Sequence, residues 1–273
     1  QGRPVALLTR HAKDEWIAPP LLSLGVTLSV TDAFDTDQLG TFAGEVERRL
    51  TPLECARRKA QLACELTGLD FGLGSEGSFG GGPMPVLLNW DEELLVFWDR
   101  SAGQEIVAYA AGPVRVSSCQ WRSPDRLEAH IAANDAKQAW IIRHPAGVMK
   151  GLCGAAELLD QLHHTVLPGM SDDQAASITI EPDLRAMHCP ERQIYIYQAA
   201  QQLAARLQSL CPRCAAVNFW PSTQVPGLPC EDCGAPTPLP LAAIVQCQCC
   251  EYEIRQPVEH TVADPQHCSW CNP

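Results

Sequence analysis

Short apolar runs alternate with helix-like stretches over the first two hundred residues, and this alternation predicts a mixed α/β domain. Runs rich in Val, Ile, Leu and Phe that are bounded by turn residues are expected to be strands. They cover residues 4–9, 26–30, 71–73, 93–98, 106–110, 139–143 and 178–180. The pair 93–98 and 106–110 is expected to form a hairpin around residues 99–103.

Two helices have clear sequence boundaries. Thr51-Pro52 places Pro at the first helical position, and Gly68 can end the helix that follows. The apolar residues of that helix fall near one face: Leu53, Ala56, Ala60, Ala63 and Leu66. A longer helix is expected over residues 191–210. The sequence therefore predicts a mixed sheet flanked by helices, in a domain that spans residues 1–208.

Four C-x-x-C pairs follow the last predicted helix, within residues 209–273. Each pair can turn two thiolates toward one point, and two such knuckles complete a tetrahedral zinc site. The eight cysteines are Cys211, Cys214, Cys230, Cys233, Cys247, Cys250, Cys268 and Cys271. Because four thiolates leave no open coordination position, we expect two structural zinc ions in this module.

The pairing of the four knuckles is open at this stage. The simplest arrangement is sequential, with the first two knuckles on one ion and the last two on the other. Nested and cross-braced arrangements fit the spacing equally well. Cys249 is left over beside Cys250, and Cys249, His260 or His267 could replace a neighbouring ligand.

The charge balance narrows the partners that the chain can bind. Its 273 residues carry a formal net charge of −12, so a broad nucleic-acid surface is not expected. From residue 206 onward, three basic residues stand against six acidic ones, which disfavours nucleic acid for the zinc module too. We expect that module to pack onto the first domain or to form a contact in a homo-oligomer, with Phe219, Trp220 and Trp270 as apolar anchors.

Other compositional features bear on location. No apolar run is long enough to cross a bilayer, and no basic start precedes an apolar stretch, so neither a membrane span nor a secretory signal is expected. Close cysteine pairs fit zinc better than disulfides, which predicts a reducing, cytoplasmic compartment. Four further cysteines, Cys55, Cys64, Cys119 and Cys153, are expected to be small core residues.

Four polar clusters lie at the ends of predicted elements, at residues 9–13, 35–45, 75–82 and 183–192. Basic and hydroxyl groups after the first strand suit an anionic ligand. Carboxylates near Gly and Thr in the second cluster suit a hard cation such as magnesium. Gly and Ser in the third let backbone N–H groups approach phosphate oxygens. Arginines at a helix start in the fourth suit a phosphate.

Each cluster also has an ordinary explanation: a solvated loop, an acidic turn, a flexible hairpin loop, and helix capping with surface salt bridges. The residues expected to contact a phosphorylated ligand are Thr9, His11, Thr41, Ser75, Gly77, Ser78, Arg185, His188 and Arg192. Lys150 is a further basic residue that can join them.

Nearly the whole chain resembles a bacterial family without an assigned activity. The motifs that carry this resemblance are DTDQLGTFAGE at 35–45, SEGSFG at 75–80, RAMHCPER at 185–192, CPRC at 211–214 and CNP at 271–273. They span both predicted domains, so the resemblance implies that the α/β domain and the zinc module occur together.

The order of the motifs also remotely resembles the inosine/xanthosine triphosphate pyrophosphatase superfamily. Its T-x-N-x-x-K loop, TFEENA-x-x-KA helix, DDSG loop and SHR helix start have similar segments here. These are Thr9, His11 and Lys13; TFAGE at 41–45 with RKA at 58–60; SEGS at 75–78; and His188 with Arg192. Each segment departs from the superfamily's pattern, so the base specificity does not carry over.

That resemblance implies a magnesium-dependent attack of water on the α-phosphate of a nucleotide, which releases pyrophosphate. Glu45 and Glu76 would hold the metal and position the water, and Lys13, Arg185 and Arg192 would neutralise the phosphates. Two other functions stand beside this one. They are a non-catalytic sensor of a nucleotide or phosphorylated ligand, and a zinc-ribbon protein that binds other proteins.

Overall fold

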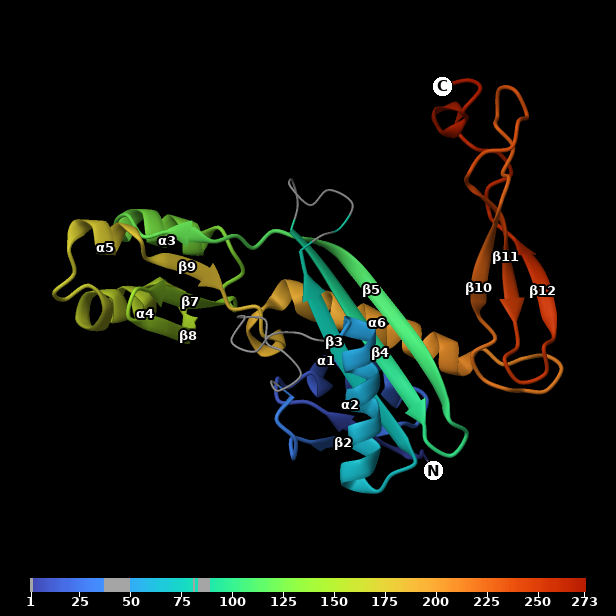
Figure 1. Cartoon of the computed structure of the whole chain (residues 1–273), viewed down its shortest axis with the longest axis horizontal. Coiled ribbons are helices and arrows are strands. Elements are labelled where there is room, and N and C mark those ends of the chain that lie inside the picture. Colours follow the sequence, from blue (N-terminus) through green and yellow to red (C-terminus); the bar gives the residue numbers. More distant parts are fainter. Residues whose placement is uncertain (1, 37–49, 81, 83–88) are drawn as a thin grey trace. The chain divides into compact units, whose positions relative to one another are not determined.

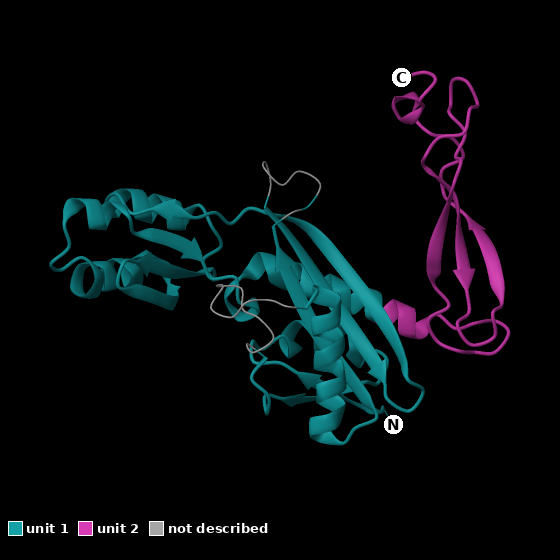
Figure 2. Ribbon diagram, viewed as in Figure 1, with its two compact units in different colours: residues 1–203 teal, residues 204–273 magenta. Residues whose placement is uncertain are grey.

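The computed structural model describes residues 2–36, 50–80, 82 and 89–273. The chain divides into two compact units, Gln1–Leu203 and Ala204–Pro273, which we call the α/β unit and the cysteine-rich unit (Figure 2). The division falls within helix α6 (Pro190–Gln208), whereas the sequence places the boundary after residue 208. No helix among the described residues is both long enough and apolar enough to cross a membrane.

The α/β unit is built on a five-stranded mixed sheet (Figure 1). Its strands in spatial order are β2 (Thr27–Thr31), β1 (Pro4–Leu8), β3 (Phe71–Phe79), β4 (Asn89–Asp99) and β5 (Gln104–Val114). β1 runs parallel to β2 and β3, whereas the pairs β3–β4 and β4–β5 are antiparallel. This arrangement confirms the predicted fold class, and the β4–β5 pairing confirms the expected hairpin.

Helix α2 (Pro52–Thr67) covers one face of this sheet and begins and ends where the sequence predicts. The Thr51 hydroxyl accepts the Glu54 N–H, and the Glu54 carboxylate accepts the Thr51 N–H at 2.8 Å, which completes a capping box. Gly68 ends the helix in the left-handed conformation with φ 74°. Leu66 was expected on the buried face but is 43% exposed. It lies in the last turn of the helix, at the margin of the face that packs on the sheet.

Strand β3 approaches α2 so closely that only glycine fits between them. A Cβ on Gly74 would lie 1.9 Å from the carbonyl oxygen of Ala56, and a Cβ on Gly72 would lie 2.0 Å from that of Ala60. Gly77 has the opposite orientation, since its Cβ would lie 2.2 Å from Nη2 of Arg192 in α6. The second face of the sheet is therefore the one that α6 covers.

Replacing Gly74 by Ala is expected to destabilise the α/β unit by about 1–3 kcal/mol, because the new methyl group forces the helix and strand apart. Urea unfolding followed by circular dichroism would measure the loss. The matched change Ser78→Ala in the same strand removes one hydrogen bond of 3.3 Å to Glu92 at a half-buried position. It should cost about 0.5 kcal/mol, and equal losses in the two variants would refute the packing argument.

The expected Gly-rich phosphate loop is wrong for residues 75–79. They continue strand β3, where Ser75 through Phe79 pair with residues 91–95 of β4. An extended strand points successive N–H groups in opposite directions, so it cannot gather them around one phosphate. The glycines at 72, 74 and 77 instead allow close packing of the two helices on the sheet.

Between β5 and α6 the chain forms a second, four-stranded antiparallel sheet with its own core. Its strands in spatial order are β6 (Cys119–Gln120), β9 (Thr179–Pro182), β7 (Ala139–His144) and β8 (Gly147–Cys153). The accompanying helices are α3 (Pro124–Ala132), α4 (Gly154–Gln161), α5 (Asp172–Ala176), η2 (Leu162–Val166) and η3 (Ala186–His188). Trp140 is fully buried in this core, beside Ile142, Leu158 and Ile178.

Several parts of the α/β unit differ from expectation. Helix α1 (Asp14–Leu22) is absent from the elements predicted from the sequence, and it contains Pro19 and Pro20, which disfavour a helix interior. Of the four cysteines that the sequence places in the core, Cys55 and Cys64 are buried and Cys119 is half-buried, but Cys153 is exposed. Cys153 ends strand β8 directly before α4, at a position that points away from the core.

The cysteine-rich unit contains a three-stranded antiparallel sheet. Its strands are β10 (Pro221–Pro226), β11 (Pro240–Gln246) and β12 (Glu253–Pro257), with β11 in the centre, and the short helix η4 (Pro265–His267) follows. A small core forms from Phe219, Val245, Cys211 and Cys247. Because this core is so small, the unit needs additional cross-links to be stable.

Candidate functional site

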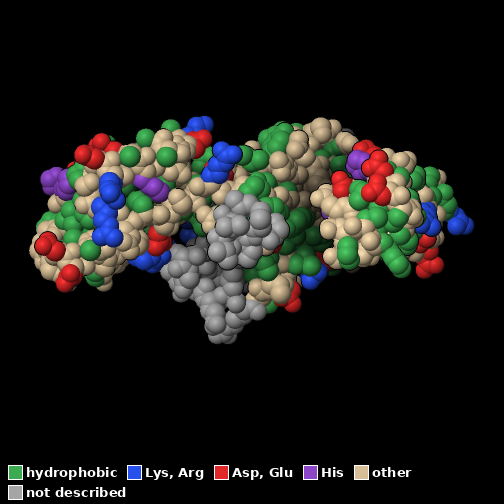
Figure 3. Space-filling view, turned by 90° about the horizontal axis from the view of Figure 1, so that it is seen from above, with side chains coloured by type: hydrophobic (Ala, Val, Ile, Leu, Met, Phe, Trp, Pro, Cys, Tyr) green, Lys and Arg blue, Asp and Glu red, His purple; other side chains and the backbone are tan. Residues whose placement is uncertain are grey.

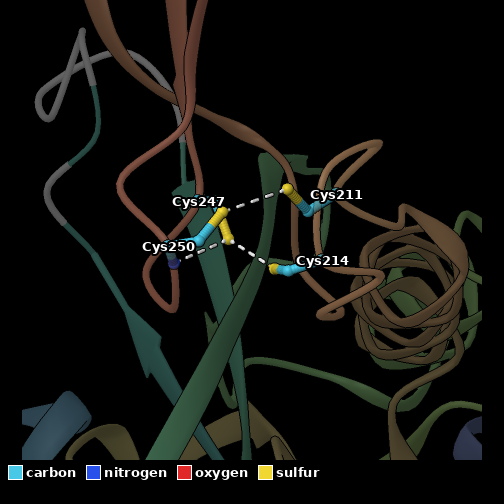
Figure 4. Close-up of side chains that lie close together, drawn as sticks. All are labelled: Cys211, Cys214, Cys247 and Cys250. Carbon is cyan, nitrogen blue, oxygen red and sulfur yellow. Dashed lines mark hydrogen bonds between the residues drawn. The ribbon is translucent and has the colours of Figure 1, made fainter.

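The cysteine-rich unit gathers its knuckle cysteines into two clusters of four. The sulfur atoms of the first cluster point toward one another; its members are Cys211, Cys214, Cys247 and Cys250 (Figure 4). The second cluster consists of Cys230, Cys233, Cys268 and Cys271. Within each cluster the four sulfur atoms all lie within 4.8 Å of one another.

The sulfur spacing fits metal ions and not disulfides. In the first cluster the Sγ–Sγ distances are 3.7 Å for Cys211–Cys250 and 3.5 Å for Cys214–Cys247. In the second cluster the corresponding distances are 3.8 and 3.6 Å. A disulfide requires about 2.05 Å, whereas four sulfurs bound at about 2.3 Å to one zinc ion lie roughly 3.8 Å apart. Each cluster can therefore hold one zinc ion.

The sequential pairing of knuckles is wrong, because the first and third knuckles share one cluster and the second and fourth share the other. The antiparallel sheet between them explains this cross-braced pattern. β10 runs from the first knuckle to the second, β11 returns to the third, and β12 leads back toward the fourth. Odd and even knuckles are thereby brought to opposite ends of the sheet.

The thiols of the first cluster cannot all ionise without a cation. Backbone N–H groups of Cys250 and Cys249 point at Sγ of Cys247, and they lower the pKa of that thiol to about 6. The Ala216 N–H also lowers the pKa of Cys214, but hydrogen bonds with neighbouring sulfurs, that of Cys250 first, raise it to about 12. One thiol with a lowered pKa therefore lies beside a thiol with a raised pKa. A bound cation would stabilise both as thiolates, as expected of a metal site.

The alternative ligands considered from the sequence lie outside both clusters. The Cys249 side chain is exposed, and only its backbone N–H contacts the first cluster, where it donates to Sγ of Cys247. His260 and His267 do not belong to either group of potential metal ligands in the described chain. The two clusters are thus complete with cysteines alone.

A second set of functional candidates meets inside the α/β unit, on the face of the sheet that α6 covers. Lys13, at the start of α1, donates to the Ser75 hydroxyl at 2.9 Å and to Glu93 Oε2 at 3.2 Å. Arg192, in the first turn of α6, donates from Nε to Glu93 Oε1 at 3.0 Å and from Nη2 to the same oxygen. We call Lys13, Ser75, Asp91, Glu93 and Arg192 the polar centre.

Burial makes the charges of the polar centre dependent on one another. Lys13 is 7% exposed, Arg192 and Glu93 are each 1% exposed, and Asp91 is fully buried. Burial lowers the pKa of Lys13, and Glu93 partly opposes this. Burial alone would also lower the pKa of Arg192, but Glu93 and Asp91 hold it above its ordinary value. The two cations are therefore neutralised by carboxylates of β4.

Asp91 is the least satisfied member of the polar centre. Arg192 Nε lies 3.3 Å from its Oδ1, but that N–H donates to Glu93, so neither oxygen of Asp91 accepts a hydrogen bond within the described structure. Burial, and then the nearby Glu93 charge, raise the pKa of Asp91 to about 7. A carboxyl group in this position holds its proton far more tightly than it does in the unfolded chain.

The stability of the chain should reflect this proton. Because the folded pKa of Asp91 lies above the unfolded value of about 4, the folded state binds the extra proton, and this contribution is lost as pH rises from about 4 to about 7. The variant Asp91→Asn cannot lose this proton, so its free energy of unfolding should not fall in the same way as pH rises. Relative to wild type, the variant should therefore become more stable toward the upper end of this pH range. Urea titrations at several pH values would test this, and parallel pH curves would contradict it.

Glu76 lies on the other face of the sheet, toward α2. Its carboxylate accepts from Lys59 Nζ of α2 at 2.5 Å, and Glu76 is only 5% exposed. Ser78 shares that face and donates to Glu92 at 3.3 Å. The buried carboxylate thus has a lysine as a partner, where the sequence suggested a metal ion.

Arg185 and His188 form a third group, next to the four-stranded sheet. Asp183 is 1% exposed and accepts hydrogen bonds from the Gly151 N–H at 3.1 Å and from Arg185 Nη2 at 2.6 Å. A Cβ on Gly151 would lie 3.4 Å from Arg185 Nη2 and 3.6 Å from His188 Nε2. Burial lowers the pKa of His188. The backbone of Gly151, next to Lys150, is therefore flanked by a guanidinium and an imidazole.

The remaining predicted contacts are placed as follows. Thr9 is buried directly after β1, its N–H donates to Thr31, and its hydroxyl accepts the His11 N–H at 3.3 Å. Thr41 and Glu45 lie outside the residues that the structure describes. The structure therefore brings Lys13, Ser75, Gly77 and Arg192 together, with Glu76 across the sheet and Arg185 and His188 in a separate group.

The expected apolar anchors of the cysteine-rich unit have different environments. Phe219 is buried and stacks on Tyr252 with ring centroids 5.9 Å apart, so it is a core residue. The Arg206 guanidinium lies 5.3 Å from the Trp220 ring. Trp270 is 80% exposed. On the face drawn in Figure 3, Lys and Arg side chains are scattered among acidic and apolar ones rather than gathered into one basic patch.

Sequence reasoning missed Asp91, Glu93 and Lys59. The signal for the first two was their alternation with Leu95 on one face of a strand, which implies buried carboxylates that need cations. Glu92, between them, made the segment look like an ordinary exposed acidic strand end. Lys59 was visible only as part of a motif, since its contact with Glu76 joins two elements far apart in the sequence.

Comparison with known proteins gives one match. The model of one protein family, a domain of unknown function, matches residues 59–273. This range contains the SEGSFG, RAMHCPER, CPRC and CNP motifs, while DTDQLGTFAGE lies before it. No curated protein and no solved structure matches the chain.

Proposed function

The chain belongs to the DUF6671 family, a domain of unknown function, and from the geometry of its α/β unit we propose that it is a metal-dependent hydrolase. Its substrate in this proposal is a nucleoside triphosphate or a related phosphorylated small molecule, and pyrophosphate is the product. The proposal rests on the contacts among the segments that resemble the inosine/xanthosine triphosphate pyrophosphatase superfamily.

Three contacts carry the proposal. Lys13, from the segment after β1, binds Ser75 of the SEGS segment in β3. Lys59, from the RKA segment in α2, binds Glu76 of the same SEGS segment. Arg192, from the segment at the start of α6, packs on Gly77. Segments that lie far apart in the sequence therefore meet at three consecutive residues of one strand, with Lys59 on the α2 face of the sheet and Lys13 and Arg192 on the α6 face.

Burial divides these residues into two roles. Lys13 and Arg192 are enclosed and already paired with Glu93, so we assign them to positioning β3 against α1 and α6. Arg185 is held by Asp183 with its side chain 33% exposed, and His188 beside it is half-buried. Arg185 supplies the positive charge that the proposal assigns to the phosphates, and the His188 imidazole beside it can donate a hydrogen bond to them.

Glu76 is the residue assigned to the metal. Magnesium in nucleotide enzymes is commonly bound by one or two carboxylates together with substrate phosphates and water, so a single carboxylate in the described chain suits it. Bound there, the ion would supply positive charge where negative charge develops during phosphate cleavage. Lys59 pairs with Glu76 and fixes the orientation of its carboxylate.

The test is product release from a panel of standard and deaminated nucleoside triphosphates with magnesium, resolving pyrophosphate from phosphate. One substrate should yield pyrophosphate, and Glu76→Gln should lower that rate at least about 100-fold. Glu92→Gln in the neighbouring strand β4 is the matched control and should retain activity.

The other outcomes separate the alternatives. Thermal stabilisation by a nucleotide without product would favour the non-catalytic sensor. Silence across the panel, with no stabilisation by any member, would remove both the hydrolase and the sensor and favour a protein-binding role.

The cysteine-rich unit has a structural role in this proposal. Each cross-braced cluster is closed by four thiolates, so two zinc ions would replace the large core that the unit lacks. Neither ion would take part in hydrolysis, since neither has an open coordination position.

A further inference from the structure

The two cysteine clusters have the same composition but different surroundings. In the first cluster, Cys211 and Cys247 are buried in the small core beside Phe219. Cys250 packs against the same core, and Cys214 is the single exposed ligand of this cluster. Three of its four sulfur atoms are therefore held by the packing of the unit.

The second cluster exposes two of its ligands. Cys233 and Cys271 are exposed, whereas Cys230 and Cys268 are buried. The two residues between the cysteines of each knuckle are exposed as well, and one of them, Trp270, has an exposed fraction of 80%. The sulfur atoms of Cys233 and Cys271 lie within 4.8 Å of each other. Solvent therefore reaches two neighbouring ligands in this cluster and one in the first.

Zinc binding would keep these two sulfur atoms in their reactive form. Cysteine binds zinc as the thiolate, and the thiolate is also the form that attacks oxidants. Susceptibility to oxidation follows thiolate character and exposure together. In the zinc-loaded chain, Cys233 and Cys271 combine both properties.

We propose that Cys233 and Cys271 are a site of reversible oxidation by hydrogen peroxide, which joins them in a disulfide and takes two ligands from the zinc ion of the second cluster. This oxidation depends on the zinc binding proposed above and not on the hydrolysis of a nucleotide. The cysteine-rich unit would lose one of its two metal cross-links in the oxidised state.

The oxidation has two steps. The Cys233 thiolate attacks one oxygen of hydrogen peroxide and becomes a sulfenic acid, while the O–O bond breaks and releases hydroxide. The Cys271 thiolate then attacks the sulfenic sulfur, forms the S–S bond and displaces a second hydroxide. The two thiolates lose two electrons, the peroxide gains them, and both hydroxide ions take up protons from the solvent. A thiol reductant reverses the change by returning two electrons to the disulfide.

The first cluster is expected to resist the same oxidation. A disulfide bond is about 2.05 Å long, but Sγ of Cys214 lies 3.5 Å from Sγ of Cys247. Cys247 is 3% exposed and is packed in the core with Phe219, so closing that gap would disturb the core. In the second cluster both reacting cysteines are exposed, so their approach displaces less of the packed structure.

The test is zinc release from the full, zinc-loaded chain on addition of hydrogen peroxide. A chromogenic chelator too weak to remove zinc by itself would follow the release, and mass spectrometry would map the disulfides. One ion should leave at least about 10-fold faster than the other, together with formation of a disulfide between Cys233 and Cys271. Dithiothreitol and added zinc should restore the second ion.

Two variants separate this disulfide from other thiol oxidation. Cys271→His keeps four ligands, since three cysteines and one histidine also bind structural zinc, but it cannot form the disulfide. It should retain two zinc ions and lose the fast release. Cys249→Ser removes an exposed thiol that lies outside both clusters, and it should release zinc as wild type does.

The results that would overturn the proposal are distinct from one another. A chain that carries no zinc when isolated would remove zinc binding and this oxidation with it. Equal release of the two ions, or a fast release that persists in Cys271→His, would overturn the oxidation site alone. The disulfide map of the wild type decides the matter even where the variant fails to bind its second ion, because a map without Cys233–Cys271 contradicts the proposal.

Discussion

Removal of zinc from the purified chain is expected to unfold the cysteine-rich unit and to leave the α/β unit folded. The cysteine-rich core consists of a few residues around Phe219, whereas the α/β unit has several cores of its own. Structural zinc contributes about 10–16 kcal/mol of apparent binding free energy in small zinc-finger peptides. The binding free energy lost with two zinc ions is therefore larger than the free energy of unfolding of a domain of this size.

The measurement combines metal analysis with limited proteolysis. As isolated, the chain should carry two zinc ions, and a strong chelator should make residues 204–273 protease-sensitive while the α/β unit persists. Restoring zinc should restore protection. A cysteine-rich unit that stays resistant without any metal would show that its fold does not depend on the clusters.

The cross-braced pairing makes a sharper prediction about zinc content. Changing all cysteines of the first and third knuckles to Ser should remove one ion and keep the other, since only the first cluster is lost. Changing those of the first and second knuckles should remove both ions, because each cluster loses two ligands. Sequential pairing predicts the reverse pattern, so two metal analyses of the full chain distinguish the arrangements.

The zinc unit illustrates what the sequence can and cannot predict. The knuckles were predictable because a C-x-x-C turn is encoded within four residues. Their pairing was not, because it depends on how β10, β11 and β12 run relative to one another, and that order is set by long-range contacts. The same distinction applies to helix α2, whose start at Thr51 and end at Gly68 are local signals.

The glycines of β3 show how a local pattern in the sequence can mislead. The sequence predicts a phosphate loop at residues 75–82, which includes Gly77 and lies just after Gly72 and Gly74, because flexibility and close packing require the same residue. Only the positions of α2 and Arg192 reveal that the missing side chains make room for neighbouring elements. For the same reason the hydrogen bonds of Lys13 to Ser75 and Glu93 could not be predicted, since they join residues from three separate elements.

Arg192→Met is expected to destabilise the α/β unit by about 3–5 kcal/mol, because it leaves buried carboxylates without their main cation. Arg192 is 1% exposed. It forms ion pairs with Glu93 and Asp91 and donates a hydrogen bond to the Leu184 carbonyl oxygen. The matched control is Arg57→Met. Arg57 also makes a paired contact with a glutamate, Glu105, but the two side chains are 35% and 27% exposed, so the loss should be about 0–1 kcal/mol.

The pH dependence and a second variant identify the cause of that loss. Without Arg192, Asp91 should take up its proton more readily, so the cost of Arg192→Met should shrink as pH falls from about 7 toward 5. Adding Glu93→Gln to Arg192→Met should recover part of the stability, because one buried charge is removed. Adding Glu93→Gln could instead increase the loss of unfolding free energy at every pH. That result would show that Arg192 stabilises the polar centre by packing, and that Glu93 is not the anion that needs its charge.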